Sequence, residues 1–386
     1  MVHRETAVLD IGSSKVSVMI AEKGINNTFN IKSSSEEDYD GYASGEFFSE
    51  DSLKNAIINA VKKAGENLRY RIKKVYISVP GEFSYCLTKE VNVTFPKRKK
   101  IKDSDIFEIF DSSQNFDENS FVINRSPIYF ILDDNRKVLN PVGEVTSKLN
   151  ILISYILTDK SFIELISKIF TELNIFDLDF VSASLSEALY LTEPETRDNG
   201  LVLIDCGYIS TSVSLVKGDG LLALKAFSMG GGHITGDLCQ CLNLSFNQAE
   251  MLKRKVVLSL DATDNDFYEV NIDGNMQPVS AKLVNEIILA RLDMFGDVFN
   301  KILNSIEFNT QNKPFIPILI TGGGLNYLKG AKDYLSKQMG KNLEYIAPSV
   351  PQMNKPHYSG ILSILDIALM QEKNIKKSLF QRIFKR

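Results

Sequence analysis

Short apolar runs alternate with helical periodicities along the chain of 386 residues. Residues 6–11 and 15–21 are β-rich runs joined by Gly12-Ser13-Ser14, a sequence that predicts a hairpin. Apolar residues then recur at helical spacing between residues 52 and 68. A second series of strands and helices begins at Gly200. The pattern predicts an α/β protein, and its length predicts more than one packed unit.

A separate block interrupts the first half of the chain, at residues 84–156. It has predicted strands of its own at 85–95, 121–133 and 149–156, and a predicted helix after Asp103-Ser104-Asp105. The expected elements outside it are helices at 162–173, within 246–310, at 325–339 and at 358–370, and strands at 74–79, 267–272 and 316–321.

One short motif occurs in both halves. Asp10-Ile11-Gly12 and Asp205-Cys206-Gly207 each end an apolar strand and lead through a hydroxyl-rich turn into a second strand. Backbone N–H groups in such a turn form a nest for phosphate oxygens, and the Asp can reach a hydrated Mg²⁺. A single Asp-x-Gly turn is usually an ordinary tight turn. Two in the same setting predict a pair of hairpins that clamp the phosphates of one nucleotide.

A third element follows the second hairpin. The apolar strand 317–321 runs into Gly322-Gly323-Gly324, where the absence of side chains would let a base or ribose lie against the backbone. Taken alone, a glycine-rich turn between a strand and a helix is the simpler explanation. The order hairpin, hairpin, glycine-rich turn is that of the actin-like ATPase superfamily. The sequence contains neither a Walker P-loop nor a G-x-G-x-x-G after a strand.

Within that superfamily the chain resembles the FtsA family over residues 5–386. Residues 9–15 resemble the first phosphate loop, 202–207 the second, 249–253 the Ala-Glu-x-x-Lys helix near the ribose and base, and 319–324 the adenosine loop. The resemblance implies that ATP is bound by Gly12, Ser13, Ser14, Lys15, Gly207, Tyr208, Gly231, Glu250, Lys253, Gly322, Gly323 and Gly324. It also implies that Asp10 and Asp205 hold Mg²⁺ through water.

The same resemblance implies an actin-like fold of two lobes with an inserted β-rich subdomain. Its expected parts are subdomain 1A (1–83, 157–182 and 356–372), subdomain 1C (84–156), subdomain 2A (183–227 and 311–355), subdomain 2B (228–310) and a C-terminal amphipathic helix (373–386).

The second phosphate loop departs from the Asp-x-Gly-Gly-Gly-Thr of many relatives, because Tyr208 and Ile209 replace two glycines. A β-branched residue resists positive φ, and both side chains are expected to take up space near the phosphates. We therefore expect ATP hydrolysis to be slow or nearly absent, and we assign no catalytic residue. Glu187 is available to orient a water, but a surface position on a helix is the expected explanation for it.

The C-terminal residues 375–386 combine five apolar side chains with five basic ones. At 100° per residue the apolar ones share about half of a helix circumference, with Lys377 and Arg382 opposite. This pattern is typical of an interfacial helix on an anionic membrane, and a helix docked on the protein itself is the alternative. The residues expected at the membrane are Ile375, Leu379, Phe380, Ile383, Phe384, Lys377 and Arg382.

Charge and composition limit the alternatives. A net charge of −4 argues against general nucleic-acid affinity, and the run 97–100 (Lys-Arg-Lys-Lys) is expected to be a solvated loop before a helix capped near Asp103 or Asp105. The four cysteines are spaced too irregularly for a metal site, and Cys239 and Cys241 are expected to pack in a core. No stretch approaches about 18 apolar residues, so we expect a cytoplasmic protein with only peripheral membrane contact.

The resemblance implies a filament-forming adaptor, at most a slow ATPase, that tethers FtsZ filaments to the inner face of the cell membrane at the division site. Its expected partners are the FtsZ C-terminal tail, other copies of the chain in a head-to-tail filament, anionic lipids and other division proteins. The tail of FtsZ would dock on residues 228–310, where candidate contacts are Arg254, Lys255, Lys282 and Arg291. Two alternatives are a PilM-like pilus-assembly protein and a small-molecule kinase of the same superfamily.

Overall fold

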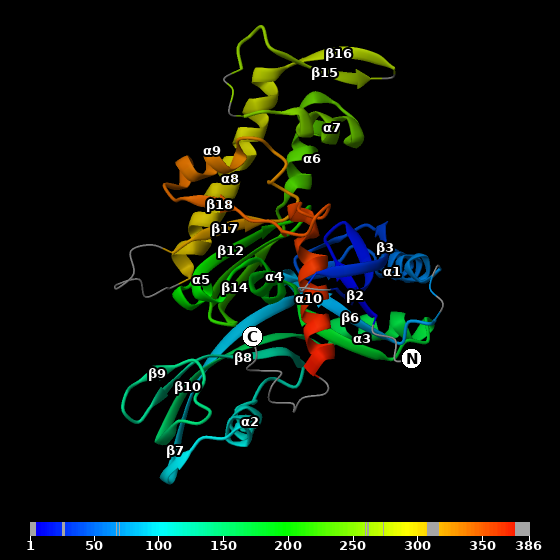
Figure 1. Cartoon of the computed structure of the whole chain (residues 1–386). Helices are drawn as coiled ribbons and strands as arrows, with labels where there is room; N and C mark the ends of the chain where they lie inside the picture. The colour runs from blue at the N-terminus through cyan, green and yellow to red at the C-terminus, as the bar shows by residue number, and fades with distance from the viewer. Residues whose placement is uncertain are drawn as a thin grey trace.

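Two lobes, each built around a five-stranded sheet, make up the body of the protein (Figure 1). The structure is a computed structural model that describes residues 5–24, 28–66, 68, 70–258, 260, 262–272, 274–306 and 316–374. The strand order is β11-β6-β1-β2-β3 in lobe 1 and β14-β13-β12-β17-β18 in lobe 2. In both sheets a hairpin of antiparallel strands lies next to strands that pair in parallel.

Lobe 1 buries both faces of its sheet, which explains the nearly continuous apolar character of β1. Helices α1 and α3 cover one face, and α10 covers the other, where Leu362 and Leu365 pack against Val8 and Tyr76. The elements are β1 (Thr6–Ile11), β2 (Lys15–Lys23), β3 (Phe29–Asp38), β4 (Tyr42–Ala43), β5 (Glu46–Phe47), α1 (Glu50–Gly65), β6 (Lys74–Val79), a 3₁₀ turn (Gly81–Phe83), α3 (Lys160–Glu172), β11 (Asp177–Ser182), a second 3₁₀ turn (Pro356–Tyr358) and α10 (Ser359–Asn374).

Lobe 2 has the same layered construction. Helices α6, α7, α8 and α9 lie with one face of the sheet in one large core, and α4 packs on the other face. The elements are α4 (Ala183–Leu191), α5 (Pro194–Asn199), β12 (Leu201–Cys206), β13 (Thr211–Lys217), β14 (Gly220–Phe227), α6 (Gly231–Leu242), α7 (Phe246–Lys255), β15 (Phe267–Ile272), β16 (Asn275–Ser280), α8 (Ala281–Ser305), β17 (Ile318–Thr321), α9 (Ala331–Met339) and β18 (Leu343–Tyr345). The β15–β16 hairpin lies at the far end of this lobe (Figure 1).

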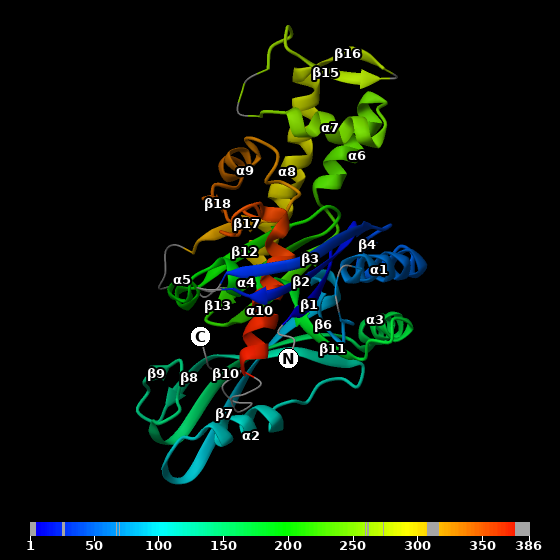
Figure 2. The same cartoon turned by 45° about the vertical axis from the view of Figure 1, so that its right-hand side comes forward.

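The block inserted into lobe 1 is a four-stranded antiparallel sheet with one helix against it, and it projects at the opposite end from β15 and β16 (Figure 2). Its strands are β7 (Ser84–Lys100), β8 (Ser120–Leu132), β9 (Lys137–Val138) and β10 (Val145–Asp159), in the order β7-β10-β8-β9. Helix α2 (Asp103–Ser112) buries Ile106 and Phe110 against alternate residues of the strands. The block thus has a hydrophobic core of its own.

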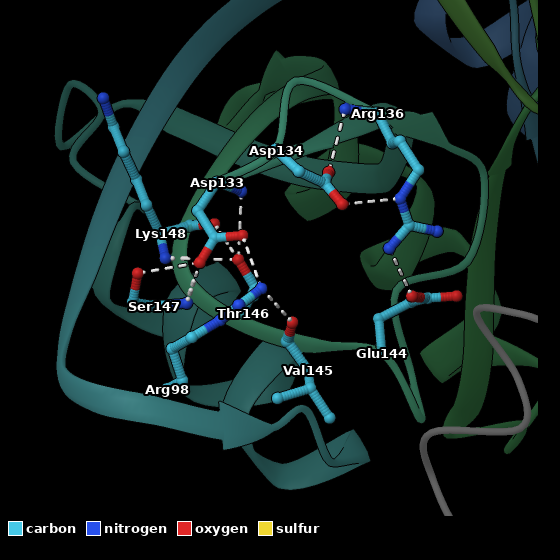
Figure 3. Close-up of polar contacts among 9 residues, drawn as sticks. All are labelled: Arg98, Asp133, Asp134, Arg136, Glu144, Val145, Thr146, Ser147 and Lys148. Carbon is cyan, nitrogen blue, oxygen red and sulfur yellow. Dashed lines mark hydrogen bonds and ion pairs between the residues drawn. The ribbon is translucent and has the colours of Figure 1, made fainter.

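The basic run at 97–100 is not a loop, as expected from the sequence, but the end of β7. Alternation along the strand turns Lys99 toward α2, where it pairs with Asp105 at 2.6 Å. Arg98 pairs with Asp133, whose carboxylate also accepts hydrogen bonds from Ser147, while Arg136 bridges Asp134 and Glu144 (Figure 3). These ion pairs neutralise part of the positive charge.

Two further expectations are corrected. The helix after the three glycines begins at Ala331 and not at residue 325. Residues 323–330 form turns in which Leu325 and Leu328 are buried. Gly330 then adopts a φ of 91° directly before the helix. Both Cys239 and Cys241 lie on α6, as expected. Cys239 is partly buried and packs against the core, but Cys241 is exposed to solvent. The expected cap of α2 is present, since the Asp105 carboxylate accepts a hydrogen bond from the Lys102 N–H.

Candidate functional site

A cavity of about 690 Å³ lies between the two lobes, and the three predicted loops meet around it. The structure brings together all but one of the residues predicted to bind nucleotide and metal. Those that line the cavity are Asp10, Gly12, Ser13, Ser14, Lys15, Asp205, Gly207, Tyr208, Glu250, Lys253, Gly322, Gly323 and Gly324. Gly231 lies just behind the wall, where its N–H donates to the carbonyl of Gly207 at 3.0 Å.

The first hairpin is closed by a hydrogen bond from the Gly12 N–H to the Lys15 carbonyl at 2.9 Å. The adjacent strand β6 fixes its acidic residue, because the Ser78 hydroxyl donates to the Asp10 carboxylate at 2.9 Å. Burial raises the pKa of Asp10, and the Ser78 hydrogen bond and the positive charge of Lys15 oppose this rise. The carboxylate is therefore held in a fixed position at the end of β1.

The second hairpin repeats this bond, from the Gly207 N–H to the Ser210 carbonyl at 2.9 Å. It also contacts the first hairpin directly, since the Ser13 hydroxyl oxygen accepts hydrogen bonds from the N–H groups of Ile209 at 2.9 Å and Ser210 at 3.4 Å. The glycine-rich loop approaches closely, and a Cβ on Gly324 would lie 2.2 Å from the Gly207 oxygen. Only glycine permits this approach.

Three carboxylates face the cavity where the two hairpins meet, and two of them, Asp10 and Asp205, are half-buried. Burial, and then the charge of Asp10, raise the pKa of Asp205 to about 7. The third is Glu187, which was expected on a helix surface but is only 3% exposed and lines the cavity. Burial and the charges of Asp205 and Asp10 raise its pKa well above the usual range.

The position of Glu187 follows from the start of α4. The Ser182 hydroxyl caps this helix by accepting the Leu185 N–H, and the next turn directs Glu187 into the cavity. Leu185 and Ala188, on either side of it, are almost fully buried. This run of apolar neighbours is the signal in the sequence that Glu187 lies inside the protein.

Helix α7 supplies an ion pair at the other end of the cavity. The Glu250 carboxylate bonds to Lys253 at 2.6 Å, to Arg254 at 2.9 Å and to the Thr235 hydroxyl at 2.6 Å. Lys253 is buried and also donates to the Gly231 carbonyl at 2.9 Å. Burial raises the pKa of Glu250, but the hydrogen bonds from Lys253 and Thr235 outweigh it and lower the pKa overall.

The two residues that replace glycines point in different directions. The Tyr208 ring lines the cavity and turns toward α6 and α7, with its centroid 6.1 Å from that of Phe246. Ile209 is not among the lining residues and instead reaches Gly41 of lobe 1. The expectation that both side chains fill the space near the phosphates is wrong for Ile209. Neither residue is among the described residues with positive φ, so the loop adopts this backbone without glycine.

Other residues of the wall were missed by the sequence analysis. Tyr42 lines the cavity near the first hairpin, and Tyr327 and His357 hydrogen-bond to each other across the two lobes. Tyr39 lies just behind and donates to the Gly12 carbonyl at 2.7 Å. No local motif marks any of these residues, because the tertiary fold alone brings them to the site.

The residues expected to contact an acidic partner peptide occupy different environments. Arg291 makes a two-pronged ion pair with Asp237, and Arg254 lines the cavity. Lys255 donates to the Glu269 carbonyl, and Lys282 pairs with Asp264 on an exposed surface. The residues expected at the membrane (Ile375, Lys377, Leu379, Phe380, Arg382, Ile383 and Phe384) lie outside the described residues.

The side chains at the site suit a magnesium ion that keeps most of its water ligands better than a metal ion bound by protein side chains alone. Among the described residues no group of three or more His, Cys, Asp or Glu side chains could hold a metal ion by itself. Mg²⁺ usually keeps several waters and takes one or two carboxylates together with phosphate oxygens. Asp10 and Asp205, one from each lobe, fit that requirement.

Comparison with known proteins identifies related sequences. The model of the family "Cell division protein FtsA" matches residues 202–363. Cell division protein FtsA of Staphylococcus epidermidis is 25% identical over 369 residues, which are 94% of this chain and 78% of the relative. FtsA of Bacillus subtilis is 20% identical over 367 residues, 93% of this chain and 82% of the relative.

Among the described residues no helix has the length and apolar character needed to cross a membrane.

Solved structures show the fold. The PilM–PilN type IV pilus biogenesis complex matches with a TM-score of 0.61 at 16% identity, covering 95% of this chain and 98% of that one. MreB 5 of Spiroplasma citri bound to AMPPNP matches with a TM-score of 0.57 at 11% identity, covering 97% and 99%. The predicted actin-like fold is thus confirmed, and the chain resembles cell division protein FtsA over most of its length, as its motifs predict.

Proposed function

We propose that the protein is an ATP-binding, filament-forming actin homologue that tethers FtsZ filaments to the inner face of the cytoplasmic membrane during bacterial division. The resemblance to FtsA and the actin-like fold support a division-associated actin homologue. The proposal that ATP is bound is supported by one observation: two Asp-x-Gly hairpins and one glycine-rich loop line the same cavity.

The proposed ligand lies across the cavity from the hairpins to α7. The phosphates would lie between Gly12 and Gly207, with Asp10 and Asp205 holding Mg²⁺ through water. The adenosine would lie between α7 and residues 322–324, where Glu250 has an oxygen lone pair available for a ribose hydroxyl. The related fold of MreB 5, which was solved with bound AMPPNP, supports this placement. The bound Mg²⁺ would neutralise phosphate charge.

The proposed partner surface lies at the far end of lobe 2, within residues 228–310. Phe267, Met276 and Leu283 are 55%, 54% and 44% exposed there, beside Lys282. A partner peptide with acidic and apolar residues would fit a surface that combines basic and apolar side chains. Arg291 is half-buried in its pair with Asp237, and Arg254 faces the cavity. Lys282, whose pair with Asp264 is exposed, and Lys255 are therefore the better candidates among the four basic residues.

The proposed membrane contact is the segment after α10. The last described turn of α10 faces the inserted block in both views (Figures 1 and 2). Burial of five large apolar side chains at roughly 1.5–3 kcal/mol each is an upper limit, and basic residues add about 1 kcal/mol each near anionic lipid. Ordering of the segment offsets much of this gain. A single tail is then a reversible anchor, and a row of tails on a filament binds by avidity.

Assembly into filaments is supported by the fold alone. A double helical filament of MamK has a subunit that matches this chain with a TM-score of 0.53 at 12% identity. The PilM-like alternative shares the fold equally well. The lipid-binding tail favours the FtsA-like function over it.

The test is co-sedimentation of the full chain with anionic vesicles, compared with a chain that ends at residue 372. We expect the shortened chain to stay in the supernatant, and Phe380→Glu with Phe384→Glu to have the same effect because two charges would enter the lipid boundary. Neutralising Lys377 and Arg382 should have a smaller effect that shrinks as salt rises. If the double glutamate variant still pellets with the vesicles, the tail docks on the protein and the adaptor function is wrong.

A further inference from the structure

We infer that the hairpin of β4 and β5 is a strap that holds the two lobes together beside the phosphate end of the cavity, whether or not nucleotide is bound. The strap consists of residues 41–47. It belongs to lobe 1 by its packing, but its turn bonds to lobe 2 immediately before α6. The role of the strap in nucleotide exchange rests on the nucleotide site proposed above.

The strap is firmly anchored in lobe 1. Tyr42 and Phe47 pack on Phe83 with ring centroids 5.0 Å and 4.6 Å away, and Phe83 packs in turn on Phe162 of α3. The Phe48 N–H donates to the Gly41 carbonyl at 3.0 Å and closes the base of the hairpin. Any force on the turn is therefore transmitted to the core of lobe 1.

The turn of the strap reaches lobe 2 through one serine. The Ser44 N–H donates to the Ser228 hydroxyl at 2.7 Å, and this hydroxyl donates to the Glu82 carboxylate of lobe 1 at 3.0 Å. The same carboxylate accepts the Gly45 N–H at 3.2 Å. Ser228 is thus held by the strap and by Glu82 at once. The bonds form because Ser44 adopts a φ of 54°, which a non-glycine residue rarely does.

A second contact lies at the base of the strap. Gly41 has a φ of 93°, and a Cβ there would lie 2.8 Å from the Ile209 side chain and 2.3 Å from the Ser13 carbonyl oxygen. Ile209 of lobe 2 therefore packs against the strap while its N–H bonds to the Ser13 hydroxyl. This gives the replacement of glycine by Ile209 a physical role, because a glycine would remove this apolar contact across the lobes.

The strap predicts that the lobes stay closed without nucleotide and that exchange of nucleotide requires the strap to open. The test uses Ser228→Ala and Glu82→Gln, with Glu46→Gln on exposed β5 as the matched control. Deuterium exchange of residues 41–47 and 205–212 is measured on the nucleotide-free protein in EDTA. Dissociation of a fluorescent ATP analogue is measured by stopped flow in Mg²⁺. Circular dichroism checks that each variant is folded.

For Ser228→Ala and for Glu82→Gln we expect deuterium exchange of both segments to become about fivefold faster, which is the effect of losing one hydrogen bond. Dissociation of the ATP analogue should become faster by the same factor. Glu46→Gln should match the unchanged protein. Wild-type rates of exchange in folded Ser228→Ala and Glu82→Gln would overturn the strap. If the ATP analogue binds neither the unchanged protein nor any variant, the proposed nucleotide site is wrong. Deuterium exchange then still decides whether the strap holds the two lobes together.

Discussion

Replacement of Asp205 by asparagine should make the nucleotide-free protein more stable at neutral and alkaline pH. Asp205 is half-buried, and desolvation together with the nearby charge of Asp10 raises its pKa from 3.8 to about 7. A carboxyl whose pKa is higher in the folded state than in the unfolded state binds more protons when folded. The free energy of unfolding therefore falls as pH rises from about 4 to about 7. Asparagine has a similar shape and no charge, so it removes this loss.

The size of the effect follows from the shift in pKa. The difference between 3.8 and about 7 is about three pH units. Each unit corresponds to 1.36 kcal/mol, so the full loss above pH 7 is about 4 kcal/mol. We expect Asp205→Asn to gain about 2 to 4 kcal/mol at pH 8, since the amide also has to satisfy its own hydrogen bonds. The gain should be under about 1 kcal/mol at pH 4, where both states of the wild-type carboxyl bind protons.

Urea unfolding in EDTA at pH 4, 6 and 8, followed by circular dichroism, measures this difference. Glu187→Gln should show the same sign, because Glu187 faces the same cavity and its pKa is also raised by burial. Glu46→Gln, on an exposed strand, should change nothing. A folded Asp205→Asn protein that is less stable than wild type at pH 8, or whose difference from wild type does not depend on pH, would refute the reasoning. A group that destabilises the empty protein in this way is typical of a functional site.

Two further predictions concern the proposed ligand. Asp10→Ala should weaken binding of a fluorescent ATP analogue in Mg²⁺ by at least about tenfold, roughly 1.4 kcal/mol, measured by titration; unchanged affinity would mean that the site is misplaced. Hydrolysis by the vesicle-bound protein should be slow, because Tyr208 and Ile209 replace the glycines of many relatives and the second hairpin is already bonded to Ser13 of the other lobe. A phosphate-release assay that gives turnover on the order of 10 per second would contradict this and favour the kinase alternative.

The loops of the site could be predicted because each is a local pattern. Asp10-x-Gly12 and Asp205-x-Gly207 follow apolar strands, and the close approach of Gly324 to Gly207 leaves room for no other residue. The inserted block could be predicted in the same way, because its strands, such as β7, are long local patterns that largely alternate in burial. Element ends were less accurate. The turn at 323–330 looks helical in sequence because Leu325 and Leu328 have helical spacing, yet both are buried by the turn itself.

Residues that reach the site from distant elements could not be predicted in this way. Glu187 looks like a surface residue because a charged side chain on a short helix is usually solvated. Its burial depends on how α4 packs between the sheet of lobe 2 and α10, and its apolar neighbours Leu185 and Ala188 carry the local hint. The strap is hidden for a related reason. Ser228 and Ser44 are 184 residues apart, and neither lies in a motif.

Tyr208 and Ile209, which replace two glycines of many relatives, have different roles in the structure. From sequence alone the change suggests only obstruction, since added side chains in a phosphate loop take up space. The structure separates the two residues, because Tyr208 extends along the cavity toward α7 whereas Ile209 crosses to Gly41 of the other lobe. A loop whose Ile209 side chain packs on the opposite lobe has less freedom to rearrange during hydrolysis. The slow hydrolysis that we expect and the strap that we infer would then both depend on the Ile209 side chain, and Ile209→Gly should affect both together.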